Sequence, residues 1–347
     1  MKKYLNRNVG RAFCSANQHA TTLGTWLAWG ALVCCNVSWA TVYPLREDGA
    51  NIFGEVTETS TQYEDTLIDL ARSYSLGYEE LMRVNPGVDP WLPGDGTRIL
   101  IPGKRLLPAG PRTGIVVNLP EHRLYYFPPV KRGEAPVVHT FPVSIGKMDW
   151  QTPIGTTRVV GKQRNPNWYP PESVRKEHAE RGDPLPKVVK PGPDNPLGAY
   201  SLRLGIASGS YLIHGTNNPA AVGMAVTHGC IRMYPEDIER LFGMIRVGTP
   251  VTLINEPVKI AFVDGELWLE VHPPVDAMGQ SFEPDVDQFS ERLTEILGDS
   301  VTAIHWDLAL DALRKAEGIP VVVGIEADLS DPPAQDNHAT VDADIAR

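Results

Sequence analysis

Cysteine and positive charge are both scarce in this chain of 347 residues. It contains four cysteines, and three of them, Cys14, Cys34 and Cys35, lie within the first 40 residues. Acidic residues number 42 against 32 lysines and arginines, which gives a formal net charge of −10. An acidic chain without a basic patch is a poor candidate for binding nucleic acid or an anionic membrane surface. We therefore expect no nucleic-acid partner.

The first 40 residues also lack acidic side chains, and their apolar run at 23–39 is too short to span a bilayer comfortably. The run ends at Ser38-Trp39-Ala40, which places small residues at the two positions that a signal peptidase reads. We predict that residues 1–40 are a cleaved secretory signal peptide. An uncleaved signal anchor is the alternative. A lipoprotein anchor is less favoured, because Val33 and Cys34 stand where lipidation needs a small residue.

Removal of the signal peptide leaves Cys230 as the one cysteine of the mature chain, in a compartment where disulfides usually form. It also removes four basic residues, so the mature chain carries a net charge of −14. A lone thiol cannot cross-link the fold. An isolated cysteine is commonly a small buried hydrophobe, but the residues around Cys230 favour a nucleophile.

Residues 211–232 bring two histidines and this cysteine together in the sequence. A thiol attacks as the thiolate, and because a free cysteine has a pKa of about 8.5 it needs a base or a cationic neighbour. The sequence predicts a strand ending at His214 and a helix over 235–245, so His214 and Cys230 can face each other across a pocket. This is the arrangement of a Cys/His pair.

Two glycines and an arginine beside the pair fit the same chemistry. Gly215 and Gly229 allow the backbone to approach a substrate closely, and amide N–H groups next to Gly229 can form an oxyanion hole. Arg232 carries a planar fork suited to a substrate carboxylate or a backbone carbonyl.

His228 leaves more than one role open. In an extended backbone it lies on the same face as Cys230, so it can be the base, an orienting residue or a metal ligand. With His214 and Cys230 it would make a Cys/His₂ zinc set. The spacing is unlike that of zinc sites, and no carboxylate stands where a water-activating base is expected. We therefore expect no metal.

Residues 52–102 predict a small module of strand, helix, helix and strand, with helices at 65–74 and 78–84 and a strand at 97–102. The helix start Asp65-Thr66-Leu67, the pair Asn85-Pro86 and the final Ile101-Pro102 resemble a LysM module. That family binds glycans containing N-acetylglucosamine. Glu64 replaces the usual glycine of the first loop, and a spacer domain without a ligand is the alternative.

From residue 114 the pattern changes to many short strands with Gly/Pro turns, typical of a mainly β fold of sandwich or barrel-like form. One prominent helix is predicted at 235–245. Residues 165–195 hold seven prolines, and we expect a functional lid there, because Trp168 and Tyr169 favour packing. A C-terminal extension follows at 255–325, where His272 and His305 are expected to be structural. Residues 326–347, with six acidic residues and one basic residue, predict a solvated tail.

The segments His214-Gly215-Thr216 and Thr227-His228-Gly229-Cys230-Ile231-Arg232 resemble the signature of the L,D-transpeptidase (YkuD-like) catalytic domain. Thr152-Pro153-Ile154-Gly155 and the stretches at 195–198 and 248–251 extend the resemblance over 114–254. With the LysM-like module and the signal peptide, the chain resembles the periplasmic Gram-negative members of that family.

The resemblance implies a function and a role for each site residue. Cys230 would attack the carbonyl of the L-centre of meso-diaminopimelate in a peptidoglycan tetrapeptide stem and release D-alanine. His214 would move the proton, and Arg232 would orient the substrate. Backbone groups around His228 and Gly229, supported by Gly215 and Thr227, would form the oxyanion hole. No cofactor is implied, and the partners would be peptide stems and glycan strands.

The fate of the acyl group stays open at this point. The acceptor can be a second diaminopimelate, which gives a 3-3 cross-link, or a lysine of an envelope lipoprotein. Water as acceptor would make the protein an L,D-carboxypeptidase or hydrolase with the same Cys/His site. A non-catalytic wall-binding protein with a structural Cys230 is the remaining alternative.

Overall fold

The computed structural model describes residues 42–46, 51–146, 152–207, 210–275, 286–297 and 302–326. The predicted signal peptide at 1–40 lies outside the described residues, as does the acidic tail after Glu326. In the part of the chain that is described, no helix is long and apolar enough to cross a membrane.

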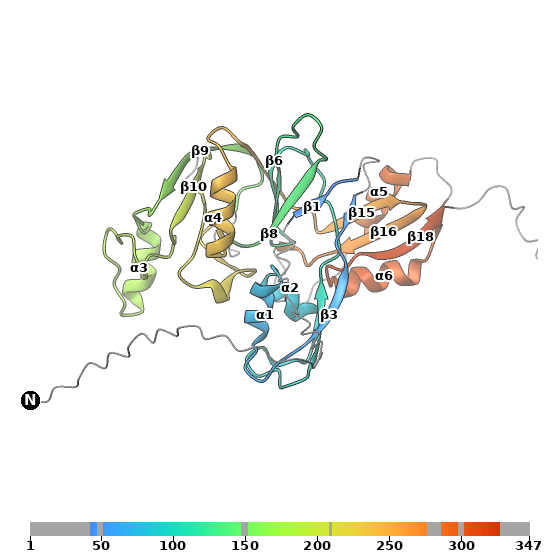
Figure 1. Cartoon of the computed structure of the whole chain (residues 1–347), viewed down its shortest axis with the longest axis horizontal. Coiled ribbons are helices and arrows are strands. Elements are labelled where there is room, and N and C mark those ends of the chain that lie inside the picture. Colours follow the sequence, from blue (N-terminus) through green and yellow to red (C-terminus); the bar gives the residue numbers. More distant parts are fainter. Residues whose placement is uncertain are drawn as a thin grey trace, which may run out of the picture. The chain divides into compact units, whose positions relative to one another are not determined.

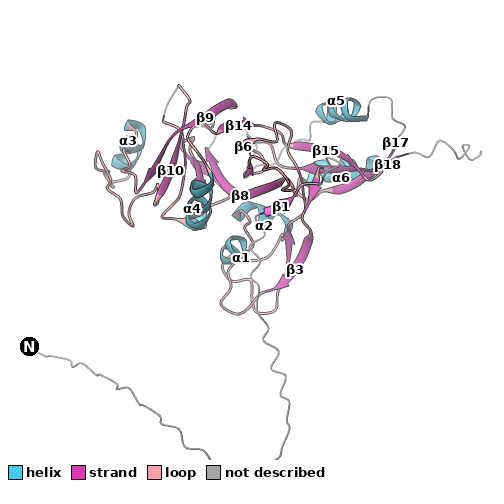
Figure 2. Cartoon of the chain, turned by 45° about the horizontal axis from the view of Figure 1, so that its top comes forward, coloured by secondary structure: helices cyan, strands magenta, loops and turns pink. Residues whose placement is uncertain are grey.

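One large sheet contains the strands of residues 114–254, so the prediction of a mainly β fold is confirmed (Figure 2). Its ten strands are β1 (Val42–Pro44), β6 (Gly114–Asn118), β7 (Arg123–Phe127), β8 (Val137–Gly146), β9 (Gly155–Arg164), β10 (Tyr200–Leu204), β11 (Leu212–His214), β12 (Ala225–Thr227), β13 (Ile231–Met233) and β14 (Pro250–Ile254).

Strand β8 closes this sheet on itself. The strand order is β1-β8-β13-β11-β10-β9-β14-β6-β7, and β7 pairs in turn with β8. The first half of β8 pairs with β7 through Phe141, whereas its second half pairs with β13 through Val143 and Ser144. Since one long strand serves both ends of the path, the sheet is barrel-like and has an enclosed apolar interior.

Helix α4 (Pro235–Met244) covers the sheet beside β10 (Figure 1). Pro235 stands at its first turn, and Ile238, Leu241 and Phe242 are buried on its inner face. The helix predicted for 235–245 is therefore present, and its apolar stripe completes the core that the strands begin.

The N-terminal module has the expected order of β3 (Val56–Ser60), α1 (Leu67–Ser73), α2 (Tyr78–Val84) and β4 (Arg98–Pro102). The Thr66 hydroxyl caps α1 by accepting the Asp69 N–H at 3.1 Å. Buried Asn85 ends α2. Its amide donates to the carbonyls of Leu81 and Leu100 at 2.9 Å each, and its Oδ1 accepts the Leu100 N–H at 2.8 Å. Asn85 thereby holds the second helix against the last strand.

This module contacts the chain segment that connects His214 to Cys230. The Tyr78 N–H donates to the Val222 carbonyl at 3.0 Å. A Cβ on Gly223 would lie 2.3 Å from the Cα of Gly77, so the two backbones touch at a pair of glycines. At the edge of the contact, Arg72 pairs with Glu236 of α4 at 2.7 Å.

The C-terminal extension is a folded unit with its own core. Its sheet has the order β15 (Val258–Val263), β16 (Glu266–Val271), β18 (Val321–Glu326) and β17 (Thr302–Ile304). Helix α5 (Val286–Leu297) packs on β15, and α6 (Trp306–Lys315) packs on β16 and β18 (Figure 1). Phe289 and Leu313 are buried between these helices and the sheet. The two-stranded pair of β2 (Ile52–Phe53) and β5 (Arg105–Leu106) connects the module to this region.

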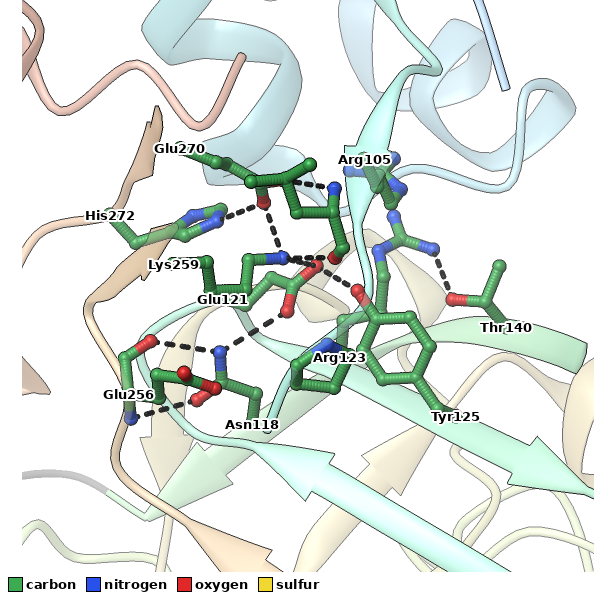
Figure 3. Close-up of polar contacts among 12 residues, drawn as sticks. Arg105, Asn118, Glu121, Arg123, Tyr125, Thr140, Glu256, Lys259, Glu270 and His272 are labelled. Atoms are coloured by element: carbon green, nitrogen blue, oxygen red, sulfur yellow. Dashed lines mark hydrogen bonds and ion pairs between the residues drawn. The ribbon is translucent and has the colours of Figure 1, made fainter. Parts of the chain in front are cut away.

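A buried lysine joins the extension to the catalytic sheet (Figure 3). The Lys259 ammonium lies 2.5 Å from Glu270 and 3.1 Å from Glu121, and it donates to the Leu106 carbonyl at 2.7 Å. All three charged side chains are almost completely buried. Burial raises the pKa of Glu121, but the charges of Lys259, His272 and Arg105 outweigh it and hold that pKa at about 2.

Candidate active site

Two adjacent parallel strands bring His214 and Cys230 together. In the pairing of β11 with β13, Ile213 lies opposite Ile231 and His214 opposite Arg232. Cys230 immediately precedes β13, so in this parallel register it lies beside Leu212 at the start of β11, two positions before His214. The strand pairing brings the two residues close together in the fold, although sixteen positions separate them in sequence.

Both residues line a pocket of about 370 Å³. Its lining is Trp168, Pro171, Val174, Pro196, Leu197, Ser210, Tyr211, His214, Thr227, His228, Cys230 and Arg232. Five of the seven residues singled out from the sequence are in this set, while Gly215 and Gly229 lie next to it. Trp168 and Val174 come from segment 165–195, which therefore forms one wall of the cavity, whereas Tyr169 is exposed.

His214 is held as a neutral imidazole with a defined tautomer. It is 4 % exposed, and its Nδ1–H donates to the Gly215 carbonyl at 2.6 Å. A carbonyl can only accept, so Nδ1 carries the hydrogen and Nε2 keeps its lone pair. Burial, together with the positive charge of Arg232, lowers the pKa of His214 to about 3. At neutral pH the imidazole can therefore accept a proton.

The thiol of Cys230 is also neutral at rest. Burial raises its pKa, and the Leu212 N–H and the Arg232 charge offset this effect in part. Its Sγ lies 3.7 Å from the Ser210 carbonyl oxygen. A neutral thiol beside a neutral imidazole makes proton transfer part of the attack, which is general base catalysis rather than attack by a standing thiolate.

The turn leading into Cys230 is fixed by two threonine hydroxyls. Thr227 Oγ1 donates to the Cys230 carbonyl at 2.5 Å, and Thr152 Oγ1 donates to the Gly229 carbonyl at 3.1 Å. The N–H of Cys230 shares a planar peptide with the Gly229 carbonyl, so it points to the opposite side, away from Thr152. This orientation leaves the N–H available to an oxyanion.

One expectation about this turn needs correction. The backbone between His228 and Cys230 is not extended, since Gly229 has a φ of 95°, in the left-handed region that favours glycine. His228 reaches the pocket because of this bend and not through strand alternation. Gly215 packs closely against α4, since a Cβ there would lie 3.1 Å from Ile238.

His228 contacts a residue that the sequence analysis did not single out. Its Nε2 lies 3.1 Å from Glu177 Oε2, and Glu177 Oε1 accepts from Arg181 Nη2 at 2.5 Å. Glu177 belongs to α3 (Glu172–Glu180), a helix within the segment expected to be a loop. The one signal was the run Glu172 to Arg181, which lacks proline in an otherwise proline-rich stretch.

Comparison with known proteins agrees with this geometry. A family model described as the L,D-transpeptidase catalytic domain (YkuD) matches residues 112–253. The protein named "Probable L,D-transpeptidase ErfK/SrfK" of Escherichia coli K12 is 39 % identical over 85 % of this chain and 95 % of its own length. "Probable L,D-transpeptidase YbiS" of the same strain is 41 % identical over 72 % and 80 %. A solved catalytic domain of the E. faecium L,D-transpeptidase is 24 % identical and covers 41 % of this chain and 96 % of that domain, with a TM-score of 0.29.

The chain belongs to the L,D-transpeptidase family. The resemblance that rested on the motifs around His214 and Cys230 is confirmed by these relatives, and the chain is an enzyme of the L,D-transpeptidase type.

In this L,D-transpeptidase, Arg232 lines the pocket and has one donor without a partner among the described residues. That donor is its buried Nε–H. A buried guanidinium N–H without a partner is costly unless a ligand accepts from it. Arg232 is therefore suited to a substrate carboxylate or carbonyl.

The described residues of the transpeptidase include one group that resembles a metal site, away from the cysteine. Ligand atoms of Glu121, Glu270 and His272 lie within 4.8 Å of one another. The Lys259 ammonium already binds both glutamates, and His272 Nε2 is bonded to Glu270 at 2.6 Å. The cluster is a structural ion network, and His272 is a buried structural residue, as expected.

Proposed function

We propose that this L,D-transpeptidase transfers the acyl part of a peptidoglycan tetrapeptide stem to an amine, through a thioester on Cys230. The observation that carries the proposal is the shared pocket of the Cys230 thiol and the neutral His214 imidazole, walled by residues of segment 165–195. The substrate class follows from the family and from the carboxylates of such stems, which match Arg232.

In the acylation step, Sγ of Cys230 bonds to the carbonyl carbon at the L-centre of meso-diaminopimelate. The thiol proton passes to His214 Nε2. The C–N bond to the terminal D-alanine then breaks, and the leaving amine takes the proton from His214. D-alanine departs and the thioester remains. This role needs an unprotonated imidazole, and the low pKa of His214 keeps it unprotonated at neutral pH.

The oxyanion of the tetrahedral intermediate is stabilised by N–H groups of His228, Gly229 and Cys230. The hydroxyls of Thr227 and Thr152 support this arrangement by holding the neighbouring carbonyls on the other side of the backbone. Each such donor is worth about 2.7–4 kcal/mol in enzymes that use one. Gly215 contributes indirectly, because its carbonyl orients His214.

In the second step, a neutral amine attacks the thioester, the new C–N bond forms and the C–S bond breaks. The amine proton returns to the sulfur through His214, so the pair is restored. Two acceptors suit this chemistry: the side-chain amine of a second diaminopimelate, and a lysine of an envelope lipoprotein. Water as acceptor would give a carboxypeptidase, whose products differ in mass from those of amine transfer.

The remaining parts of the chain suit action on the cell wall. The LysM-like module at 52–102 would hold the glycan strand, and the segment at 1–40 would direct the protein to the periplasm. Neither role needs a cofactor.

The proposal is tested by incubating the protein with purified sacculi and identifying the muropeptides by mass spectrometry. We expect loss of D-alanine together with new 3-3 linked products or lysine adducts. Cys230→Ser should lower the rate by on the order of 10⁴-fold or more, because the nucleophile of a cooperative pair is lost.

Unfolding temperature serves as the control, and Cys230→Ser should leave it nearly unchanged, because the substitution conserves size. Release of D-alanine without any amine adduct would replace transpeptidation with hydrolysis. Full activity in the serine variant would rule out the thioester.

A further inference from the structure

Helix α3 contacts the catalytic turn through the carboxylate of Glu177. Glu177 accepts a hydrogen bond from His228 Nε2 at 3.1 Å, and His228 stands two residues before Cys230. Arg181, one turn further along the chain, binds the other oxygen of Glu177 at 2.5 Å. The Glu177 and His228 side chains are 29 % and 28 % exposed, so the pair lies at the rim of the pocket and is partly shielded from water.

The two ends of segment 165–195 are bonded to each other. Trp168 and Val189 form a two-stranded bridge with hydrogen bonds of 2.9 Å in both directions. Buried Asn195 donates to the Pro166 carbonyl at 2.8 Å. With its two ends joined in this way, the segment is a closed loop that carries α3 at its far end, and Val174 is buried toward the pocket.

Glu177 brings negative charge to the rim of a pocket whose own lining has none. None of the twelve lining residues is acidic, and Arg232 contributes positive charge. His228 of the catalytic turn holds the Glu177 carboxylate at this rim. The bond therefore positions α3 beside the pocket that contains the Cys230 sulfur. Loss of this bond would let α3 move away and admit water to an acyl group on Cys230.

We propose that Glu177 is a specificity-determining residue, which latches α3 onto His228 so that acyl-Cys230 reacts with an amine rather than with water. The inference rests on the proposed thioester mechanism. With an amine, the C–S bond is replaced by C–N and the thiol recovers the amine proton. With water, the C–S bond is replaced by C–O, the thiol recovers a water proton, and the product is a free carboxylic acid.

The test measures how the acyl group is divided between the two products. Full-length protein is incubated with a purified disaccharide tetrapeptide as donor and acceptor, and the dimer and the hydrolysed tripeptide are quantified by mass spectrometry. In Glu177→Ala we expect the ratio of dimer to tripeptide to fall about tenfold, the typical worth of a charge-assisted hydrogen bond. Formation of the acyl-enzyme, followed by intact mass in a single turnover, should change much less.

Two further variants separate the latch from a general loss of structure. Glu180→Ala removes an exposed carboxylate from the same helix, where it lies 4.0 Å from Lys176, and should keep the wild-type ratio. Glu177→Gln keeps an oxygen that accepts from His228, so it should retain most of the transfer. A glutamine variant that behaves like the alanine variant would overturn a hydrogen-bonded latch.

Failure of this inference differs from failure of the proposed function. Wild-type protein that gives tripeptide and no dimer would refute transpeptidation itself. Wild-type protein that gives dimer, with the same product ratio in Glu177→Ala, would refute the latch alone. An equal loss of acylation and transfer in Glu177→Ala would also refute it, since the residue would then act on the whole site.

Discussion

At the scale of single residues, the site combines a half-buried thiol with a buried imidazole that is fixed in one tautomer. The Gly215 carbonyl holds Nδ1–H, so the accepting nitrogen is defined before a substrate arrives. Burial keeps both groups neutral, because an imidazolium or a thiolate in the pocket would lose solvation by water. The pair therefore becomes charged during the reaction and not before it.

This state predicts an unusual pH dependence of acylation. Because the pKa of His214 is depressed to about 3, the imidazole stays competent to accept a proton down to that pH. We expect the rate of acyl-enzyme formation to show no inflection near 6.5, the ordinary pKa of histidine, and to fall only as the pH drops toward 3. Stopped-flow or quenched mass measurements between about pH 4 and 8 would test this.

A substitution of Arg232 provides the matched variant for this pH prediction. Its charge is the second cause of the low pKa of His214, after burial, so Arg232→Gln should move the acid limb to higher pH. A wild-type profile with a clear step near the ordinary histidine pKa would contradict the neutral pair.

The sequence was sufficient to find these residues but not their partners. His214 and Cys230 were predictable because their chemistry is rare and a strand and a helix frame them. Glu177 was not, because one glutamate among many carries no signal until α3 places it beside His228. Thr152 was part of the recognised motif, yet its bond to the Gly229 carbonyl depends on a tertiary contact.

At the scale of elements, the contact between α2 and the segment before Cys230 leaves no space for a side chain. Gly77 and Gly223 meet backbone to backbone, and Gly223 has a φ of 89°. A side chain there would have to separate the N-terminal module from the catalytic domain, since the neighbouring atoms belong to backbone and cannot rotate away.

We therefore predict that Gly223→Ala destabilises the protein more than backbone strain alone explains. Gly265 is the matched control, because its φ of 82° is similar and, among the described residues, no atom beyond its chain neighbours lies within 4 Å of where a Cβ would stand. Gly265→Ala should cost about 1–2 kcal/mol for the left-handed conformation. Gly223→Ala should cost about 1–3 kcal/mol more through overpacking.

Urea unfolding monitored by fluorescence measures both variants, and limited proteolysis between the module and the catalytic domain gives a second readout. Equal losses in the two variants would mean that the Gly77 contact does not restrain the module.

Some of the short elements were not predicted from the sequence. The module's two helices and α4 were predicted within a few residues, because their apolar spacing and caps are local. Strands β12 and β13 were not predicted, since three residues are too few to show alternation. These two short strands frame the catalytic turn.

At the scale of the whole described chain, the buried Lys259 connects the catalytic sheet, strand β5 and the C-terminal extension (Figure 3). The sequence gives no signal for its partners, because burial of an ion network depends on contacts between distant segments. A buried ion is tolerated only when its charge and hydrogen bonds are satisfied. Lys259 satisfies Glu121 and Glu270 together, so its removal would leave two carboxylates without their cation.

We predict that Lys259→Met destabilises the protein by about 3–5 kcal/mol, the usual cost of breaking a buried ion pair on one side. Lys131→Met is the control, because Lys131 is exposed and its pair with Glu134 spans 3.4 Å, so little should change. Calorimetry measures both variants.

A chelator should leave the wild-type unfolding temperature unchanged, because the lysine supplies the cation of this cluster. A large drop with chelator would instead indicate a bound metal ion.

The contact between Gly77 and Gly223 also limits the distance between the module and Cys230. The module is bonded directly to the segment that ends at Cys230, with no spacer between them. A glycan strand held by the module would present its peptide stems to the sulfur at one set distance. Peptide stems recur at the repeat of the sugar backbone. Which stem reaches Cys230 would therefore depend on the spacing of the stems and on where along the strand the module binds.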